Sequence, residues 1–421
     1  MVKKNLQQIF LIPVFLFFLF SVVRADETTE LRQKISDRQK AITEIEAEII
    51  KYNKELNKTT AQSKTLSEEV ARLETLKKKL SADISLTENK ISASALKIEG
   101  LQNEIGEKSI SIDNHREAIK ESIRKIHSNE AISFVEALLS QKTWAETLEE
   151  ANIFKQFELA TKDKIIELET IKVDLTNKET DATKAKKTLQ GYQIELNDKK
   201  KIAETNRQST ATLLKDTKNT ESNYLKLLAD RKTKRDAFER ELFDYESQLK
   251  FVLDPSKLPP AGKGVLAWPL EQITITQQFG VTSDSKRLYA SGSHNGVDFR
   301  ASEGTRVMSA GSGTVMGVGD TDTVCRGASY GKWILIKHSN GLATLYGHLS
   351  LIKVVSGQVV ASGELIGYSG KTGYSTGPHL HLTVFVADAV EIIQKKSQVC
   401  AGTYTLPVAP TNTYLDPLVY L

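Results

Sequence analysis

Apolar residues recur at every seventh position through the first third of the chain. From Ile35 to Ile126, twelve of the fourteen positions in this column are apolar, and the exceptions are Ser63 and Lys77. A heptad sustained over so many turns predicts a left-handed coiled coil rather than a globular helix. A weaker apolar column continues from Leu168 to Leu249. We therefore expect an antiparallel coiled-coil hairpin over residues 26–253.

The seven-residue step is lost near residues 128–148, where Ser128 and Asn129 indicate a helix boundary. We expect the tip of the hairpin here. The segment is more apolar than its flanks, with Phe134, Leu138 and Trp144. Two interpretations stay open: these side chains pack the turn against itself, or they form a docking site for a partner, because exposed apolar clusters often mark contact sites.

The second half has a different chemistry. Between Pro13 and Pro255 the chain has no proline and only three of its 24 glycines. Residues 254–264 are rich in proline and predict a short, semi-stiff linker. From Val265 onward, short β-type runs alternate with glycine turns, which predicts an antiparallel, all-β sandwich or barrel-like domain over residues 265–421. The expected fold is therefore multidomain, a helical hairpin followed by a β domain.

The N-terminus has the order of an export signal. Lys3 and Lys4 precede an apolar run, and small or apolar residues lead to a cleavage site at Ala25. We expect residues 1–25 to be a signal peptide. A retained membrane anchor is the alternative, although the apolar run to Val23 is shorter than the ~20 residues of a spanning helix. In both cases the remaining chain would lie outside the cytoplasmic membrane, in the periplasm or at the cell surface.

Charge and cysteine content exclude several functions. Lys and Arg number 57 against 53 Asp and Glu, so the net charge of +4 gives no argument for a nucleic-acid partner. Two cysteines exclude a four-thiolate zinc site. In an exported chain Cys325 and Cys400 predict one disulfide. Two free buried thiols remain the alternative.

Histidine and aspartate side chains occur in two pairs with metal-ligand spacing. His294 and Asp298 are four residues apart, and the intervening Asn295-Gly296 is a turn signal that allows them to meet. His379 and His381 project from the same face of a strand. Two imidazoles and a carboxylate form a normal catalytic zinc set with a fourth position for water. Further histidines would then move protons to and from that water.

Three motifs give these residues a resemblance to a known family. They resemble the motifs of the lysostaphin/LytM zinc endopeptidases, and they are His294-Asn-Gly-Val-Asp298, Tyr346-Gly-His-Leu349 and Ser369-Gly-Lys-Thr-Gly-Tyr-Ser-Thr-Gly-Pro-His-Leu-His381. The resemblance implies that one Zn²⁺ is held by His294, Asp298 and His381. It implies that His348 and His379 polarise water and stabilise the tetrahedral intermediate. Tyr289 is a candidate assisting residue, without a motif match.

The order of export signal, coiled coil and β domain is similar to that of EnvC-type murein hydrolase activators. This similarity implies a role in cell-wall remodelling or cell division, with peptidoglycan as substrate and an FtsX-like membrane protein bound at the coiled-coil tip. We expect a secreted zinc metalloendopeptidase that the coiled coil regulates, with the helix near Phe238 to Leu249 lying against the catalytic groove. The alternative is a non-catalytic scaffold that activates another murein hydrolase. Some members of that group have lost metal ligands, whereas no motif position is missing here.

Overall fold

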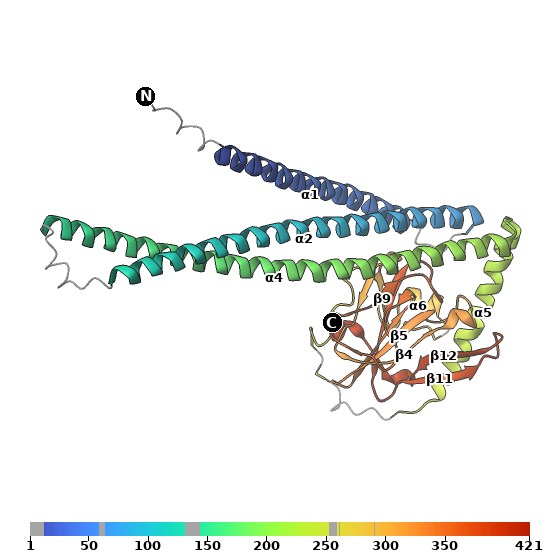
Figure 1. Ribbon diagram of the computed structural model, residues 1–421. Helices are drawn as coiled ribbons and strands as arrows, with labels where there is room; N and C mark the ends of the chain where they lie inside the picture. The colour runs from blue at the N-terminus through green and yellow to red at the C-terminus, as the bar shows by residue number, and fades with distance from the viewer. Residues whose placement is uncertain (1–11, 59–63, 131–143, 252–258, 261, 290) are drawn as a thin grey trace. The chain divides into compact units, whose positions relative to one another are not determined.

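The computed structural model describes residues 12–58, 64–130, 144–251, 259–260, 262–289 and 291–421. Four long helices precede an antiparallel β domain (Figure 1), so the predicted fold class is confirmed. The helices are α1 (Ile12–Lys58), α2 (Leu66–Glu130), α4 (Trp144–Thr217) and α5 (Glu221–Gln248). Residues 1–11 of the predicted signal, 131–143 of the predicted tip and 252–258 and 261 of the linker region lie outside the description. Within the ranges above, no helix is long and apolar enough to span a bilayer.

The chain divides into two compact units, and the first comprises Met1–Glu44 and Leu86–Glu195. Here α2 and α4 are joined by cross-helix ion pairs. Lys108 lies 3.0 Å from Asp174, and Nε2 of His115 lies 3.3 Å from Glu167. Ile112 of the heptad column is buried. Part of the seven-residue pattern therefore corresponds to a helix–helix seam, but the column from Ile35 to Ile126 runs through two helices, because α1 ends at Lys58 and α2 begins at Leu66.

The heptad pattern did not predict the break between α4 and α5. Lys218 and Asn219 both have positive φ angles, of 48° and 55°. This left-handed backbone conformation cannot continue an α-helix and reverses the chain direction locally. Thr220 then precedes the first turn of α5, and its hydroxyl donates to the carbonyl of Thr217 at 3.0 Å.

The second unit comprises Ile45–Ser85 and Leu196–Leu421. Its main sheet is antiparallel with the strand order β1-β2-β10-β6-β5-β4-β8, and β13 pairs with β10. Smaller sheets join β3-β9-β7 and β11-β12. The elements are β1 (Ile275–Gln277), α6 (Ser283–Leu288), β2 (Val297–Arg300), β3 (Arg306–Met308), β4 (Gly313–Asp320), β5 (Lys332–His338), β6 (Leu342–Gly347), β7 (Leu349–Ile352), β8 (Val359–Val360), β9 (Leu365–Ser369), β10 (His379–Val386), β11 (Glu391–Lys396), β12 (Thr403–Val408) and β13 (Tyr414–Leu415).

Apolar side chains fill both faces of the main sheet. Leu380 and Leu382 of β10 pack into one cluster, whereas Phe385 packs into the other together with Phe238 and Leu242 of α5. Because side chains alternate along a strand, His381 lies on the same face as Phe385. Helix α5 therefore packs on the sheet face that presents His381.

A disulfide joins Cys325 to Cys400, with their Cα atoms 5.5 Å apart. It connects the segment after β4 to the loop between β11 and β12. Both cysteines are buried in the cluster that contains Phe238. The bridge thus anchors the β11–β12 hairpin beside α5.

Candidate active site

The pairing of β2 with β10 brings the two predicted ligand pairs together. His381 is directly opposite Asp298 in this antiparallel ladder. His294 joins them because the chain bends at Asn295-Gly296, as the turn signal predicted. A Cβ atom on Gly296 would lie only 2.4 Å from the carbonyl oxygen of Leu382 and 2.7 Å from the His381 ring. Glycine is therefore required where the bend crosses β10.

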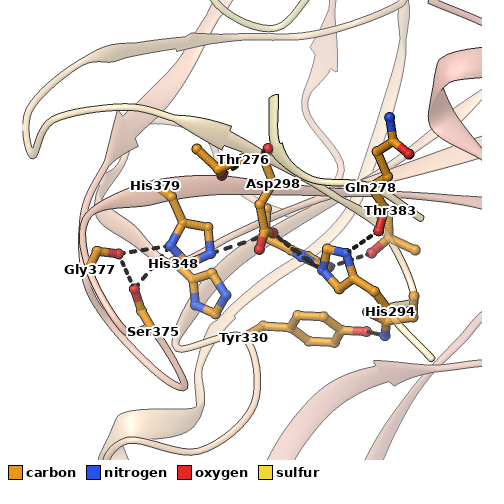
Figure 2. Close-up of polar contacts among 12 residues, drawn as sticks. Thr276, Gln278, His294, Asp298, Tyr330, His348, Ser375, Gly377, His379 and Thr383 are labelled. Atoms are coloured by element: carbon orange, nitrogen blue, oxygen red, sulfur yellow. Dashed lines mark hydrogen bonds and ion pairs between the residues drawn. The ribbon is translucent and has the colours of Figure 1, made fainter. Parts of the chain in front are cut away.

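The side chains of His294, Asp298 and His381, all of residue types that bind metals, meet in the interior of the β domain. Oδ1 of Asp298 lies 2.8 Å from Nδ1 of His381 and 3.4 Å from Nε2 of His294. The two ring nitrogens are 3.1 Å apart. All three ligand atoms lie within 4.8 Å of one another. Figure 2 shows His294 and His379 on opposite sides of Asp298.

Hydrogen bonds behind the cluster orient its rings. The carbonyl of Gln278 can only accept, so Nδ1 of His294 donates to it at 3.0 Å and leaves a lone pair on Nε2. Nε2 of His381 lies 2.8 Å from the hydroxyl of Thr383, which turns Nδ1 towards Asp298. Such outer partners fix the tautomer of a metal-binding imidazole. The three ligand atoms thus form a set that fits a single cation.

The charge state of Asp298 also fits this use. Burial opposes ionisation of this carboxyl, but the neighbouring His379, His294 and His381 outweigh it and hold its pKa well below the usual value. A buried carboxylate is retained only when paired or bound to a metal.

His348 and His379 form a second pair beside the cluster, with ring centroids 4.6 Å apart. Nδ1 of His348 donates to the carbonyl of Thr372, and Nδ1 of His379 donates to that of Gly377, both at 2.8 Å. Burial and the nearby His379 lower the pKa of His348 well below its usual value. Burial also disfavours charge on His379, but Asp298 overcomes it and raises the pKa of His379. Their environments push the two pKa values apart, as in acid–base pairs.

Two tyrosines border the site. The ring of Tyr289 stacks on His294, with centroids 5.2 Å apart and planes 6° from parallel. Burial raises the pKa of Tyr289 well above 10, which keeps the hydroxyl protonated. Tyr330 was not predicted; its hydroxyl accepts from Nδ2 of Asn295 at 2.8 Å, and its ring lies 5.7 Å from that of His381. No motif contains Tyr330, so no sequence signal pointed to it. Thr383 was also missed, although its position two residues after His381 placed it on the same strand face.

A cavity of about 210 Å³ opens beside these residues. His294, His348 and His381 line it from the β domain. Helix α5 contributes further lining through Glu239, Leu242, Phe243 and Glu246. Glu239 accepts a hydrogen bond from the backbone N–H of Ser329 at 3.1 Å. The expected contact between α5 and the groove beside these histidines is thus present in the structure.

Comparison with known proteins shows what the β domain is similar to. The family model described as Peptidase family M23 matches residues 292–392. The chain is 43% identical over 88 residues to the DD-carboxypeptidase/endopeptidase Mpg of Neisseria meningitidis and 44% identical over 94 residues to the peptidoglycan DD-endopeptidase ShyA of Vibrio cholerae. It is 34% identical over 131 residues to the cell division protein DipM of Caulobacter vibrioides.

These alignments cover 21%, 22% and 31% of this chain and 19%, 20% and 20% of Mpg, ShyA and DipM. The chain therefore matches about a fifth of the length of each relative. Among solved structures, the catalytic domain of lysostaphin from Staphylococcus simulans is 29% identical, with a TM-score of 0.26, over 35% of this chain and 90% of that one. The resemblance to the LytM/lysostaphin family is confirmed for the β domain.

Proposed function

We propose that the Peptidase family M23 domain at residues 292–392 is a zinc metalloendopeptidase that hydrolyses peptide bonds of peptidoglycan. The convergence of His294, Asp298 and His381 carries this proposal, because the complete ligand set distinguishes a peptidase from a scaffold that has lost it. The names of Mpg and ShyA, which describe peptidoglycan or DD-endopeptidases, support the substrate class.

Zinc is the metal that fits two imidazoles and one carboxylate best. His294 would bind through Nε2, His381 through Nδ1 and Asp298 through its carboxylate, since these atoms face one another. Bound zinc supplies a water of near-neutral pKa and polarises the scissile carbonyl.

His348 and His379 would handle the proton and the developing charge. Because Nδ1 of His348 donates to Thr372, its Nε2 carries the lone pair and can accept a proton from the attacking water. His379 donates through Nδ1 to Gly377, and its Nε2 lies 3.5 Å from Asp298. A protonated Nε2 on this ring would stabilise negative charge on the carbonyl oxygen.

Helix α5 would restrain the enzyme. It lines the same cavity as His294, His348 and His381, so a substrate peptide and the docked helix compete for space. Arg235 lies over the ring of Tyr374 at 4.3 Å, and Phe238 contacts Tyr404 with ring centroids 4.8 Å apart. A partner that favours the released helix by ~1.4 kcal/mol would activate the enzyme tenfold.

The place of action would be outside the cytoplasmic membrane, where peptidoglycan lies. This location rests on the relatives and on the predicted export signal at residues 1–25. An FtsX-like partner at the coiled-coil tip also stays a proposal, because residues 131–143 lie outside the structural description.

Digestion of purified peptidoglycan tests the proposed activity. Full-length protein and a variant with a loosened α5 are incubated with peptidoglycan, with and without a chelator, and released fragments are identified by mass. We expect new peptide ends that disappear with chelator and return with zinc. Fragments that persist in chelator would contradict a zinc-dependent reaction, whereas no cleavage by either protein with zinc bound would favour the scaffold.

A further inference from the structure

A second cavity of about 240 Å³ lies within the second unit and is not used by the proposed mechanism. Residues of α2, α4 and α5 line it together with the loop that follows β9. Seven of its lining side chains are basic and three are acidic. This local excess of positive charge contrasts with the nearly balanced charge of the whole chain.

The three acidic side chains already have partners or are disfavoured as anions. Glu69 binds Arg72 through two contacts, of 2.6 and 3.0 Å, and lies 3.7 Å from Lys371. Asp322 accepts from the backbone N–H groups of Gly327 at 2.7 Å and Gly373 at 3.0 Å. Burial raises the pKa of Glu303, which favours its neutral form despite nearby Arg72 and three lysines.

Arginine side chains that line the cavity keep donors that have no acceptor among the described residues. In the ranges that the structure covers, neither Arg231 nor Arg326 forms an ion pair within 4.0 Å. Burial and the nearby charge of Arg326 lower the pKa of Arg231, although Asp322 and Asp216 oppose this shift. Arg72 is only 6% exposed, yet its Nη1 has no hydrogen-bond partner among the residues described. Arg231 is half-buried and Arg326 is exposed at the cavity, so the buried Nη1 of Arg72 is the group that points to a missing acceptor, because a buried donor without an acceptor is costly.

The loop beside this cavity also positions the catalytic histidines. Thr372 and Ser375 line the cavity. The carbonyl of Thr372 accepts from Nδ1 of His348, and the hydroxyl of Ser375 lies 3.1 Å from Nδ1 of His379. A ligand held here would therefore contact the loop that carries the hydrogen bonds of the catalytic pair.

We propose that this cavity binds a carboxylate group of the peptidoglycan peptide. The chemical class of the ligand rests on the proposed function, since the peptide stems of peptidoglycan carry free carboxylates. Arg231 and Arg326 would bind it, because a planar guanidinium matches a carboxylate with two parallel hydrogen bonds. A singly charged carboxylate is favoured over phosphate because Glu69 and Asp322 line the same cavity and would repel a second negative charge.

Binding of a soluble stem peptide to the zinc-free full-length chain tests this site without turnover. Calorimetry compares a tetrapeptide with free carboxylates, its fully amidated form and inorganic phosphate. We expect the amidated peptide to bind at least tenfold more weakly and phosphate not to displace the peptide. Arg231→Gln and Arg326→Gln should each weaken binding about tenfold, the usual effect of losing one charged hydrogen bond.

Arg207→Gln is the matched control, because Arg207 is exposed on α4 and pairs with Glu204 outside the cavity. Circular dichroism verifies that each variant folds. Equal binding of the amidated peptide, unchanged binding by both cavity variants, or displacement by phosphate would each overturn the proposal. Carboxylate-dependent binding without any hydrolysis of peptidoglycan would refute the proposed function and leave this site standing. Hydrolysis without such binding would refute this site alone.

Discussion

At the scale of single residues, the site depends on which ring nitrogen of each histidine bears a proton. Sequence motifs predicted which histidines meet, because His379 and His381 share a strand face and Asn295-Gly296 allows a bend. The motifs could not predict that the backbone carbonyls of Gln278, Thr372 and Gly377 accept hydrogen bonds from these histidines. Every residue has a backbone carbonyl, so the residue type does not indicate which carbonyl will be the acceptor. The protonated nitrogen of each ring can therefore be assigned only from the folded structure.

The proton-transfer pair has a testable signature. His348→Ala and His379→Ala should retain zinc, because neither residue belongs to the converging ligand set. Turnover should fall about 10²–10⁴-fold, the usual contribution of a proton-transfer residue. Zinc is measured by atomic absorption and hydrolysis on the same samples. Loss of the metal from either variant would place that histidine among the ligands instead.

Thr383 provides a finer test of ring orientation. Thr383→Val keeps the shape of the side chain but removes the hydroxyl that lies 2.8 Å from Nε2 of His381. We expect zinc affinity to fall about 10–100-fold, as for other outer partners of metal-binding histidines. Competition with a chelator of known affinity measures the change. Unaltered affinity would show that the strand alone orients His381.

At the scale of elements, the central interaction is that of α5 with the β domain. The heptad pattern predicted a helix near Phe238 to Leu249, and the apolar positions that dock it are Phe238 and Leu242. The break at Lys218-Asn219 was not predictable, because two consecutive left-handed residues other than glycine have no strong sequence signal. That break determines where α5 begins and hence which side chains face the site.

A charged side chain introduced on the face of α5 that packs against the β domain should release the helix from that domain. Leu242 is buried against the β domain, whereas Leu225 on the same helix is 49% exposed. Leu242→Asp should increase hydrolysis of peptidoglycan by the full-length chain about tenfold or more, since it forces a carboxylate into an apolar contact. Leu225→Asp serves as the matched control and should leave the rate unchanged. Equal rates for both variants would mean that α5 does not restrain the enzyme.

Docking of α5 should also depend on pH. Burial raises the pKa of Glu239 and Glu246 to about 7, although Ser329 opposes the shift for Glu239 and Tyr414 and Ala409 oppose it for Glu246. Arg235 also lowers and Asp236 raises the pKa of Glu239, while Glu239 raises that of Glu246.

Because the docked helix binds these protons more tightly than the released one, their contribution is complete below about pH 4.5 and is lost as pH rises through about 7. Hydrogen exchange of α5, corrected for its intrinsic pH dependence, should therefore be faster at pH 8 than at pH 5.5. The double variant Glu239→Gln, Glu246→Gln should abolish this difference. A wild-type helix equally protected at both values would contradict the assignment.

At the scale of the whole molecule, two patterns of different period predicted the organisation. The seven-residue column indicated the helices, and glycine-separated β runs indicated the β domain. Neither pattern predicted that Ile45–Ser85 and the chain from Leu196 form one compact unit with that domain. This packing combines an apolar cluster, in which Leu80 and Ile202 contact Tyr368, with polar contacts of Asp198 to Lys353 at 2.8 Å and to Tyr368 at 3.2 Å. Contacts between residues so far apart in the sequence produce no repeating pattern of apolar positions, so the sequence alone does not predict them.

A zinc titration of peptidoglycan hydrolysis tests the central claim most directly. Full-length Leu242→Asp protein, stripped of metal by a chelator, receives zinc in steps while cleavage of cross-linked peptidoglycan is followed by mass. We expect activity to rise linearly and to reach a plateau at one zinc per chain. His381→Ala in the same background should neither bind zinc nor cleave. Cleavage by the metal-free protein, or by the His381→Ala variant, would contradict the account.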